Sequence, residues 1–405
     1  MAKQEAFITP SVIKWARKKA HYSIDVAAKK VGVKTEKLEE WENGKGLPTV
    51  TQARKMSQVY RRPLAAFYLS EPPKDFPLLK DFRTVEGKTP KYSTPLVFLM
   101  RQMQERQIWL SQYLKERGYE KLQFVGSGSM RSPSKIVSRN IIKTIWTNES
   151  QYFEVLSNSR STSGFLNSWL SQCERKGIFI SRTSNINSHN LIPVKEARGF
   201  VISDEYAPFI FINSKDSASA QLFTLLHELV HLWLDISGVP EHFSISYTDK
   251  EFNSNSKKEF FCNQIAAEIL MPEETIRNLP KIKDFTTDSV RQFIKEHFKQ
   301  FKVSRLAFLV RLKTLSLLRN NKIFNSLKNE YIEEHNRYKE EQKKKMKKSD
   351  GGLNPNILKI YANGESFTKI VISSYKGGFI SGRDASNLLD LKLNRMEKII
   401  KILGE

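Results

Sequence analysis

The sequence predicts an α+β fold that is predominantly helical, with one small sheet. Two observations support this prediction. Stretches with apolar residues at helical spacing recur along most of the chain, whereas three short runs between residues 177 and 213 have the composition of buried strands. With 405 residues, of which 40% are hydrophobic, the chain is long enough for two or three domains with cores of their own.

The predicted elements divide the chain into five parts. These are residues 1–72 for an all-α domain, 73–130 for a linker and connecting helix, 131–325 for a mixed domain, 326–352 for a charged helix and linker, and 353–405 for a small helical unit. The run Gly126-Ser127-Gly128-Ser129 predicts a flexible break before the mixed domain. The C-terminal unit either caps the mixed domain or mimics a second helix-turn-helix, and capping is the favoured alternative.

Residues 9–69 have the pattern of five helices around a helix-turn-helix. The apolar face of the first helix is Ile13, Ala16 and Ala20. The helix at residues 24–33 is expected to stop at Gly32, and residues 35–44 form the recognition helix. In this motif the N-terminal residues of the second helix approach base edges in the major groove. The candidate DNA contacts are Lys34, Thr35, Lys37 and Lys45.

The recognition helix also carries charges that oppose DNA binding. Glu36, Glu39 and Glu40 lie at or near the positions that face DNA, where phosphates repel carboxylates. The net charge of +23 favours a polyanionic or acidic partner, although lysine-rich solvated surfaces give the same charge without binding. The N-terminal domain is therefore either a sequence-specific DNA-binding domain or a module for protein docking or dimerisation.

The segment Leu225-Leu226-His227-Glu228-Leu229-Val230-His231-Leu232 predicts a metal site. On an α-helix, His227 and His231 project from one face and can bind a single ion. Glu228 can reach a water molecule at that ion and act as general base. The flanking apolar residues indicate that the helix is buried, where three polar side chains need partners. Satisfied core histidines are the alternative interpretation of the motif.

A second predicted helix, at residues 258–272, supplies a third ligand. Glu259 and Asn263 share one face of this helix. Two histidines and a carboxylate, with a fourth position left for water, form a catalytic zinc site. The expected ligands of one Zn²⁺ per chain are His227, His231 and Glu259. Asn263 is expected to orient a ligating histidine through a hydrogen bond.

Composition excludes several classes of protein. Two cysteines, Cys173 and Cys262, argue against a disulfide framework and fit a reducing cytosol. Cys262 is interpreted as a small buried apolar residue, not as a ligand. The N-terminal residues lack a signal-peptide core, and no apolar run approaches the length of a membrane span, about 18 residues. We expect a cytoplasmic protein with no membrane partner.

The sequence resembles the ImmA/IrrE metallopeptidases that carry an N-terminal Xre-type helix-turn-helix domain. The motifs that carry this resemblance are Gly199-Phe200, Asp204, Pro208-Phe209-Ile210-Phe211-Ile212-Asn213, Phe223-Thr224-Leu225-Leu226-His227-Glu228, Glu259 with Asn263, Ala266-Ala267-Glu268-Ile269-Leu270-Met271-Pro272, and upstream Arg62-Pro63-Leu64, Pro72-Pro73 and Asp81-Phe82-Arg83. Gln221 stands where the family often has Arg, and Cys262 and Ile265 replace the usual Ala and Phe. These departures leave the proposed ligands unchanged.

The resemblance implies a zinc endopeptidase with a gluzincin-like active site and a regulatory role, because several members cleave a helix-turn-helix repressor. The strand expected at residues 208–213 would then pair with an extended substrate backbone. The serine-rich loop Ser244–Ser256 is a candidate gate for the site. A second oxyanion-stabilising group is also expected. Its candidates, chosen only because they lie near the motif in sequence, are His189, His242 and Tyr247.

Two classes of function remain open. The first is a zinc-dependent endopeptidase in a regulatory circuit, which hydrolyses a peptide bond in a helix-turn-helix repressor or antitoxin-like protein. The second is a DNA-binding transcriptional regulator or antitoxin whose peptidase-like domain acts as a sensor or docking surface. Glu228 favours the first class, since a pure scaffold has no need of a general base.

Overall fold

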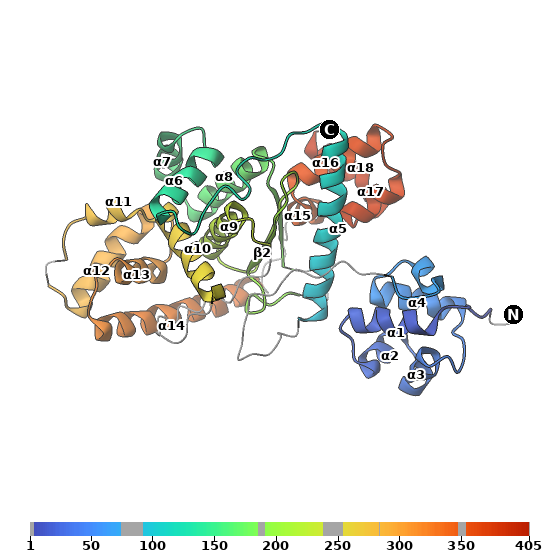
Figure 1. Cartoon of the computed structure of the whole chain (residues 1–405). Coiled ribbons are helices and arrows are strands. Elements are labelled where there is room, and N and C mark those ends of the chain that lie inside the picture. The colour runs from blue at the N-terminus through green and yellow to red at the C-terminus, as the bar shows by residue number, and fades with distance from the viewer. Residues whose placement is uncertain are drawn as a thin grey trace. The chain divides into compact units, whose positions relative to one another are not determined.

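The computed structural model describes residues 4–73, 92–184, 191–237, 254–282, 284–346 and 354–404 (Figure 1). Over these residues the chain forms eighteen α-helices and one three-stranded sheet, which confirms the predominantly helical α+β class. The chain divides into two compact units. The first unit holds the N-terminal helices and the beginning of the long helix α5 (Thr94–Glu116), and the second holds the rest of α5, the sheet and the other helices. None of the helices in the described ranges is long and apolar enough to cross a membrane.

The first unit contains the predicted helix-turn-helix. Its elements are α1 (Pro10–Lys19), α2 (Ile24–Val31), α3 (Thr35–Glu42), α4 (Val50–Tyr60) and the 3-10 helix η1 (Leu64–Tyr68). As the sequence predicts, α2 stops at Gly32, which caps it in the left-handed conformation. Leu38 and Trp41 bury one face of α3 in the core of this unit. An ion pair between Arg17 and Glu42 (2.7 Å) connects α1 to the end of α3.

The second unit is built on a sheet with strand order β1-β3-β2. β1 (Phe179–Thr183) runs parallel to β3 (Phe209–Asn213), and β2 (Gly199–Ile202) runs antiparallel to β3. The expectation that residues 208–213 offer an edge to a substrate is therefore wrong, because β3 is the central strand and is hydrogen-bonded on both sides. The composition of one strand could not reveal this, since strand order depends on pairing between distant segments.

Helices cover both faces of the sheet (Figure 1). The helices of this unit are α6 (Ser134–Ile145), α7 (Glu149–Asn158), α8 (Thr162–Arg175), α9 (Ala218–Trp233), α10 (Ser254–Leu270), α11 (Glu273–Arg277), α12 (Thr287–His297), η2 (Phe298–Phe301), α13 (Arg305–Thr314), α14 (Asn321–Met346), α15 (Pro355–Asn363), α16 (Glu365–Lys376), α17 (Gly382–Leu389) and α18 (Leu393–Leu403). Aliphatic side chains on one face of the sheet share a core with α8 and α9. These are Ile180, Val201, Ile210 and Ile212.

The C-terminal helices pack on the opposite face. The ring of Phe209 in β3 lies 5.5 Å from that of Phe367 in α16. Ser181 in β1 donates a hydrogen bond to the carbonyl of Ala362 in α15 (2.6 Å). Because successive side chains of a strand alternate between faces, these aromatic and polar groups are separated from the aliphatic core around α9. The C-terminal helices therefore cap the sheet, which is the alternative that the sequence favours.

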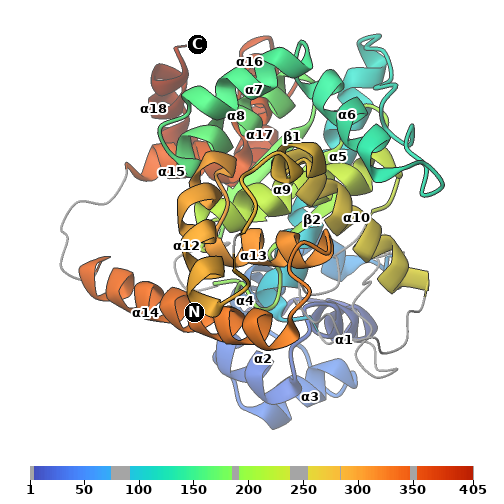
Figure 2. The same cartoon turned by 90° about the vertical axis from the view of Figure 1, so that its left-hand side faces the viewer.

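The charged segment predicted at residues 326–352 belongs to a longer element. α14 begins at Asn321 and continues through the charged sequence to Met346. Leu327 and Tyr331 are buried in the core of the second unit. α12, α13 and α14 pack against one another (Figure 2). The first half of α14 is thus a packed helix of this unit and not only a solvated connection.

The run Gly126–Ser129 is hydrogen-bonded, in contrast to the flexible break that its composition predicts. The N–H of Gly126 donates to the carbonyl of Leu232 (3.1 Å), and the N–H of Gly128 donates to that of Trp233 (2.7 Å). Both carbonyls lie in the last turn of α9, where a helix has no intrahelical donors for them. The run therefore closes the C-terminal end of the helix that carries His227 and His231.

A half-buried glutamate joins α8 to the C-terminal helices and predicts a pH dependence. Glu174 accepts hydrogen bonds from the N–H of Glu365 (3.1 Å) and the hydroxyl of Ser366 (3.3 Å). Burial, and then the charge of Glu365, raise the pKa of Glu174 to about 7. Because this pKa lies above that of an unfolded glutamate, the contribution to stability is complete below pH 4.5 and is lost as the pH rises through 7.

We expect the free energy of unfolding to contain a term from Glu174, on the order of 2 kcal/mol, that disappears between these pH values. Glu174→Gln should abolish the term, since glutamine stays neutral and can still accept the hydrogen bonds. Urea unfolding at a series of pH values measures it. The exposed Glu154→Gln variant is the control, and equal pH profiles for the two variants would contradict the prediction.

Candidate metal centre

The first two residues of the site come from one buried helix. α9 begins after Ser217, whose hydroxyl accepts a hydrogen bond from the N–H of Ala220. Apolar residues cover nearly every side of this helix, so the polar side chains of His227, Glu228 and His231 are also buried. Spacing by four residues places both imidazoles on the same face, with Nε2 atoms 2.9 Å apart.

The third residue comes from α10, which packs against α9. Glu259 is buried and directs its two carboxylate oxygens at the two histidines. Its Oε2 lies 3.1 Å from Nε2 of His227, and its Oε1 lies 3.3 Å from Nε2 of His231. The donor atoms of these three residues lie within 4.8 Å of one another. Two helices distant in sequence therefore bring the three predicted ligands to one point.

These distances fit a tetrahedral metal ion. Two nitrogen ligands at 2.0–2.1 Å from a tetrahedral zinc are separated by about 3.3 Å. The three separations among His227, His231 and Glu259 are 2.9, 3.1 and 3.3 Å, so small side-chain shifts would bring all three to this value. The donor set of two imidazoles and a carboxylate suits zinc and leaves a coordination position open.

Asn263 fixes the tautomer of one histidine. Its Oδ1 lies 3.0 Å from Nδ1 of His227. Because an amide oxygen can only accept, Nδ1 carries the proton and the lone pair of His227 is on Nε2, which faces His231 and Glu259. Asn263 lies one turn after Glu259 on α10, so the same helix supplies one candidate ligand and orients another.

The titration behaviour of the cluster also suits a cation. Burial would raise the pKa of Glu259, but the attraction of His227 and His231 outweighs it and lowers the pKa to about 2. Burial lowers the pKa of His231, which favours the neutral imidazole. A metal binds ionised carboxylates and neutral imidazoles, and the surroundings favour these forms of Glu259 and His231.

Glu228 lies next to the cluster, and no described residue forms a hydrogen bond with its carboxylate. Neither of its carboxylate oxygens has a hydrogen-bond partner among the described residues, although the side chain is fully buried. Burial and then the charge of Glu259 raise the pKa of Glu228 well above its usual value. Burial of a carboxylate without hydrogen-bond donors costs free energy, so such a group is expected mainly where it serves a function. Its position beside two imidazoles and a second carboxylate suits proton transfer.

At Gly199, β2 approaches α9 so closely that a larger side chain would clash. A Cβ added at Gly199 would lie 2.4 Å from Cγ2 of Thr224 and 3.1 Å from Oε1 of Glu228. Any larger residue would push the start of β2 away from α9. Sequence reasoning used Gly199 only as part of a motif and did not identify this role. A glycine at the start of a strand was a weak signal, since only the packed structure shows which side chains it touches.

A buried ion pair at the far end of α10 was also missed. Glu268 accepts from the guanidinium of Arg311 in α13, and Nε of Arg311 donates to the carbonyl of Met271 (3.0 Å). Tyr152 donates to the carbonyl of Ile269 (2.7 Å) in the same region. These bonds fix the C-terminal end of the helix that carries Glu259. A buried charge in the sequence Ala266–Met271 was the available signal.

Other predicted residues have simpler outcomes. Cys262 is buried beside the cluster, as expected for a small apolar residue. Burial raises the pKa of its thiol. The proposed oxyanion residues and residues 244–253 of the proposed gate lie outside the described part of the chain. Residues 254–256 form the first turn of α10. The oxyanion candidates concerned are His189, His242 and Tyr247.

The candidate DNA contacts lie around α3 in the first unit. Lys34 and Lys45 are exposed on either side of this helix. Lys37 forms an ion pair with Glu40 (2.7 Å), and the hydroxyl of Thr35 donates to Asp25 (3.1 Å). Two of the four candidates therefore already have partners on the protein. The remaining exposed carboxylates of α3 are Glu36 and Glu39.

Comparison with protein families separates the same two regions. Residues 173–313 match a peptidase family model, Peptidase_M78, described as the IrrE N-terminal-like domain. Residues 13–67 match a model described as helix-turn-helix. The first match contains His227, Glu228, His231 and Glu259, and the second contains α2 and α3. No curated protein is significantly similar to the chain.

Proposed function

Because the chain joins an IrrE-like peptidase domain to an N-terminal Xre-type helix-turn-helix domain, as in the ImmA/IrrE family, we propose that it is a zinc-dependent endopeptidase of a regulatory circuit. The observation that carries the proposal is the convergence of His227, His231 and Glu259 beside Glu228, a buried carboxylate without a partner. A scaffold would gain nothing from these four groups, because their burial is costly.

In the proposed mechanism, each side chain has a separate task. His227, His231 and Glu259 would hold Zn²⁺, and the bound ion would polarise the scissile carbonyl and lower the pKa of water. Glu228 takes the proton of the attacking water and passes it to the nitrogen of the leaving amine. Its raised pKa favours the first step, since a carboxylate of higher pKa is a stronger base. Asn263 keeps His227 in the tautomer that this arrangement requires.

The edge of β2 is the proposed site for the substrate backbone. The carbonyl of Arg198 accepts from the N–H of Asn213 (2.8 Å), so the backbone groups of every second residue from Arg198 face β3. Those of Gly199 and Val201 therefore point away from β3. An extended substrate could add to the sheet there, directly beside Glu228, and this replaces the earlier expectation for β3.

The proposed substrate is a partner protein with an exposed extended segment, such as a helix-turn-helix repressor or an antitoxin-like protein. A strand edge recognises main chain in preference to particular side chains. Choice of the partner therefore requires a second contact. The helix-turn-helix unit is the candidate for that contact. α3 exposes carboxylates, which phosphates repel but which can pair with basic groups on a protein surface.

We expect one tightly held zinc per chain, and metal analysis of protein purified without added metal measures it. Asn263→Ala should weaken zinc binding by roughly 10- to 100-fold, because His227 loses the partner that orients it. Gln264→Ala, which changes the next residue on α10, is the control. Protein that stays free of metal when zinc is offered would contradict the proposal.

The second candidate function is regulation through DNA, supported by the helix-turn-helix match. The exposed lysines Lys34 and Lys45 favour contacts with phosphates, whereas the pairing of Lys37 with Glu40 reduces them. In this alternative the peptidase domain is a sensor or docking surface. It differs from the first proposal in leaving the partner protein intact.

Salt dependence tests the DNA alternative. We expect weak binding to a short DNA duplex of random sequence, with an affinity that falls linearly on a log–log plot against salt. Lys34→Gln should reduce the slope by about 1, the share of one phosphate contact. Lys398→Gln, an exposed change in the C-terminal helices, is the control. Tight, selective binding that survives moderate salt would show that Glu36 and Glu39 do not oppose DNA contact.

A further inference from the structure

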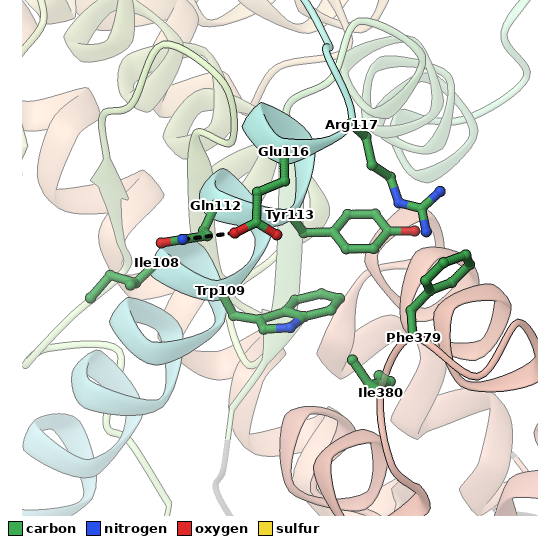
Figure 3. Close-up of a pocket in the computed structure, with 8 residues that line it drawn as sticks. All are labelled: Ile108, Trp109, Gln112, Tyr113, Glu116, Arg117, Phe379 and Ile380. Carbon is green, nitrogen blue, oxygen red and sulfur yellow. Dashed lines mark hydrogen bonds between the residues drawn. The ribbon is translucent and has the colours of Figure 1, made fainter.

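The second unit contains a pocket that none of the metal-centre residues lines. Its volume is about 580 Å³. It lies between the last turns of α5 and the turn that follows α16 (Figure 3). This volume falls in the range of small-molecule sites, about 300–1,000 Å³. The residues around it are Ile108, Trp109, Gln112, Tyr113, Glu116, Arg117, Phe379 and Ile380.

One wall of the pocket is a column of stacked groups from α5. Trp109 and Tyr113 are four residues apart, and their rings stack with centroids 5.2 Å apart and an angle of 24° between planes. Arg117, a further four residues on, lies over the ring of Tyr113 at 4.6 Å and over that of Phe379 at 4.0 Å. Figure 3 shows the guanidinium between these two rings. The helical repeat thus places Trp109 and Tyr113 on one face of α5, and Arg117, the first residue after the helix, continues the column.

The stacked cation has no anionic partner. Among the described residues, no carboxylate or carbonyl accepts a hydrogen bond from the guanidinium of Arg117, which lies over the two aromatic rings. Stacking occupies the faces of a guanidinium and leaves the N–H groups at its edge free to donate. Because the rings already restrict the side chain, little entropy remains to be lost when an anion binds. The arrangement suits a phosphate or carboxylate group.

The opposite wall is an exposed aromatic ring that the backbone holds in place. Phe379 is 66% exposed, although apolar side chains of this size are usually buried. A Cβ at Gly377 would lie 2.8 Å from the far end of the Phe379 ring, so the glycine leaves room for this position of the ring. The N–H of Phe379 also donates to the carbonyl of Ser374 (2.9 Å). The tight turn therefore fixes Phe379 beside Arg117.

The base of the column is supported and the rim is polar. The indole of Trp109 meets Phe367, a buried residue of α16, edge-on at 6.0 Å. At the rim, Gln112 donates to Oε1 of Glu116 (2.8 Å), which leaves the other carboxylate oxygen as an acceptor. The pocket thus offers aromatic faces, a cation and a carboxylate from rigid elements. These groups complement a flat ring with N–H donors and an anionic end.

We propose that this pocket binds a free nucleotide, with the base against Trp109 and Phe379, the phosphate on Arg117, and an N–H edge of the base on Glu116. A guanine base suits the last contact, because its ring N–H and amino group can donate to the other oxygen of Glu116 and to the second lone pair of Oε1, whose first lone pair accepts from Gln112. An aromatic amino acid carries the same three kinds of group, but it would fill less of the 580 Å³. The site is separate from the proposed peptidase chemistry and does not depend on it.

Calorimetric titration of the full-length protein tests this assignment with guanosine monophosphate, guanosine, inorganic phosphate and tryptophan as probes. We expect saturable binding of the monophosphate that is roughly tenfold or more tighter than that of guanosine or phosphate, since each lacks one of the two main contacts. Tryptophan should bind more weakly than the monophosphate. Absence of saturable binding, or tighter binding of tryptophan, overturns the proposal.

Two variants connect the binding to the pocket. Arg117→Met should weaken the monophosphate roughly tenfold or more and leave guanosine unchanged, because only the phosphate contact is lost. Phe379→Ala should weaken both ligands roughly fivefold or more, since base stacking is lost. Both side chains are exposed, so neither change removes a core residue. Equal loss of both ligands in Arg117→Met overturns the assignment of the phosphate to Arg117.

Lys115→Met is the matched control. It removes a positive charge two residues away, but the Lys115 ammonium lies over the ring of Tyr206 (4.9 Å) and does not line the pocket. It should bind the monophosphate like the unmodified protein. A single-stranded oligonucleotide is the last arm of the test. Binding of this strand more than roughly tenfold tighter than the monophosphate would overturn the assignment to a free nucleotide.

Discussion

Glu228→Gln is expected to keep its zinc and lose peptide cleavage by a factor on the order of 10² to 10⁴, the usual share of general-base catalysis. Glutamine has the size of glutamate but cannot take a proton from water. The three ligand side chains are unchanged, and none of them hydrogen-bonds to Glu228. Burying a neutral amide in place of a carboxylate should leave the fold intact or slightly more stable, because burial and Glu259 already disfavour the charge of Glu228.

The substrate decides whether this measurement is informative. A peptidase that adds an extended segment to the edge of β2 could ignore a generic protein substrate, so the assay should use the partner. Co-expression with the product of the neighbouring gene, scored by fragments of that protein, is the practical form. Zinc content and thermal unfolding of the variant are the controls. If both proteins leave the partner intact and regulate the circuit equally well, cleavage is incidental and the regulator hypothesis is correct.

The cluster of His227, His231 and Glu259 was predictable because its geometry is largely local. Spacing by four on one helix fixes the relation of His227 to His231, and the same rule places Asn263 one turn from Glu259. Only the packing of α9 against α10 required information from outside either helix. The apolar residues of both segments already predicted that each packs against other elements of the core. The helix-turn-helix was predictable for the same reason, with Gly32 as its stop signal.

Features that depend on pairing between distant segments were not predictable. The run of apolar residues in β3 indicates a buried strand, but not that β1 and β2 flank it on both sides. Glycine and serine at residues 126–129 suggest flexibility, yet the end of α9 supplies carbonyls that hold the backbone. The pocket around Arg117 joins α5 to a turn more than two hundred residues later. In each case a long-range contact outweighs the local preference of the sequence.

The ion pair between Glu268 and Arg311 is expected to be worth far more to stability than an exposed pair nearby. Arg311→Met leaves the carboxylate of Glu268 buried without its cation and the carbonyl of Met271 without its donor. Removal of one partner of a buried pair costs about 3–5 kcal/mol. Arg277→Met is the matched control, because Arg277 pairs with Glu273 at the surface (2.6 Å), where such pairs are worth about 1 kcal/mol or less.

Unfolding by urea, with and without zinc, measures both consequences of Arg311→Met. We expect a large loss of stability in the metal-free protein, and a further loss of zinc affinity, because the same pair fixes the end of the helix that positions Glu259. The double variant Glu268→Gln with Arg311→Met removes the uncompensated charge and should recover part of the stability. A cost no greater than that of Arg277→Met would show that solvent reaches Glu268, and the ion pair would then have no role in holding α10 against the histidines of α9.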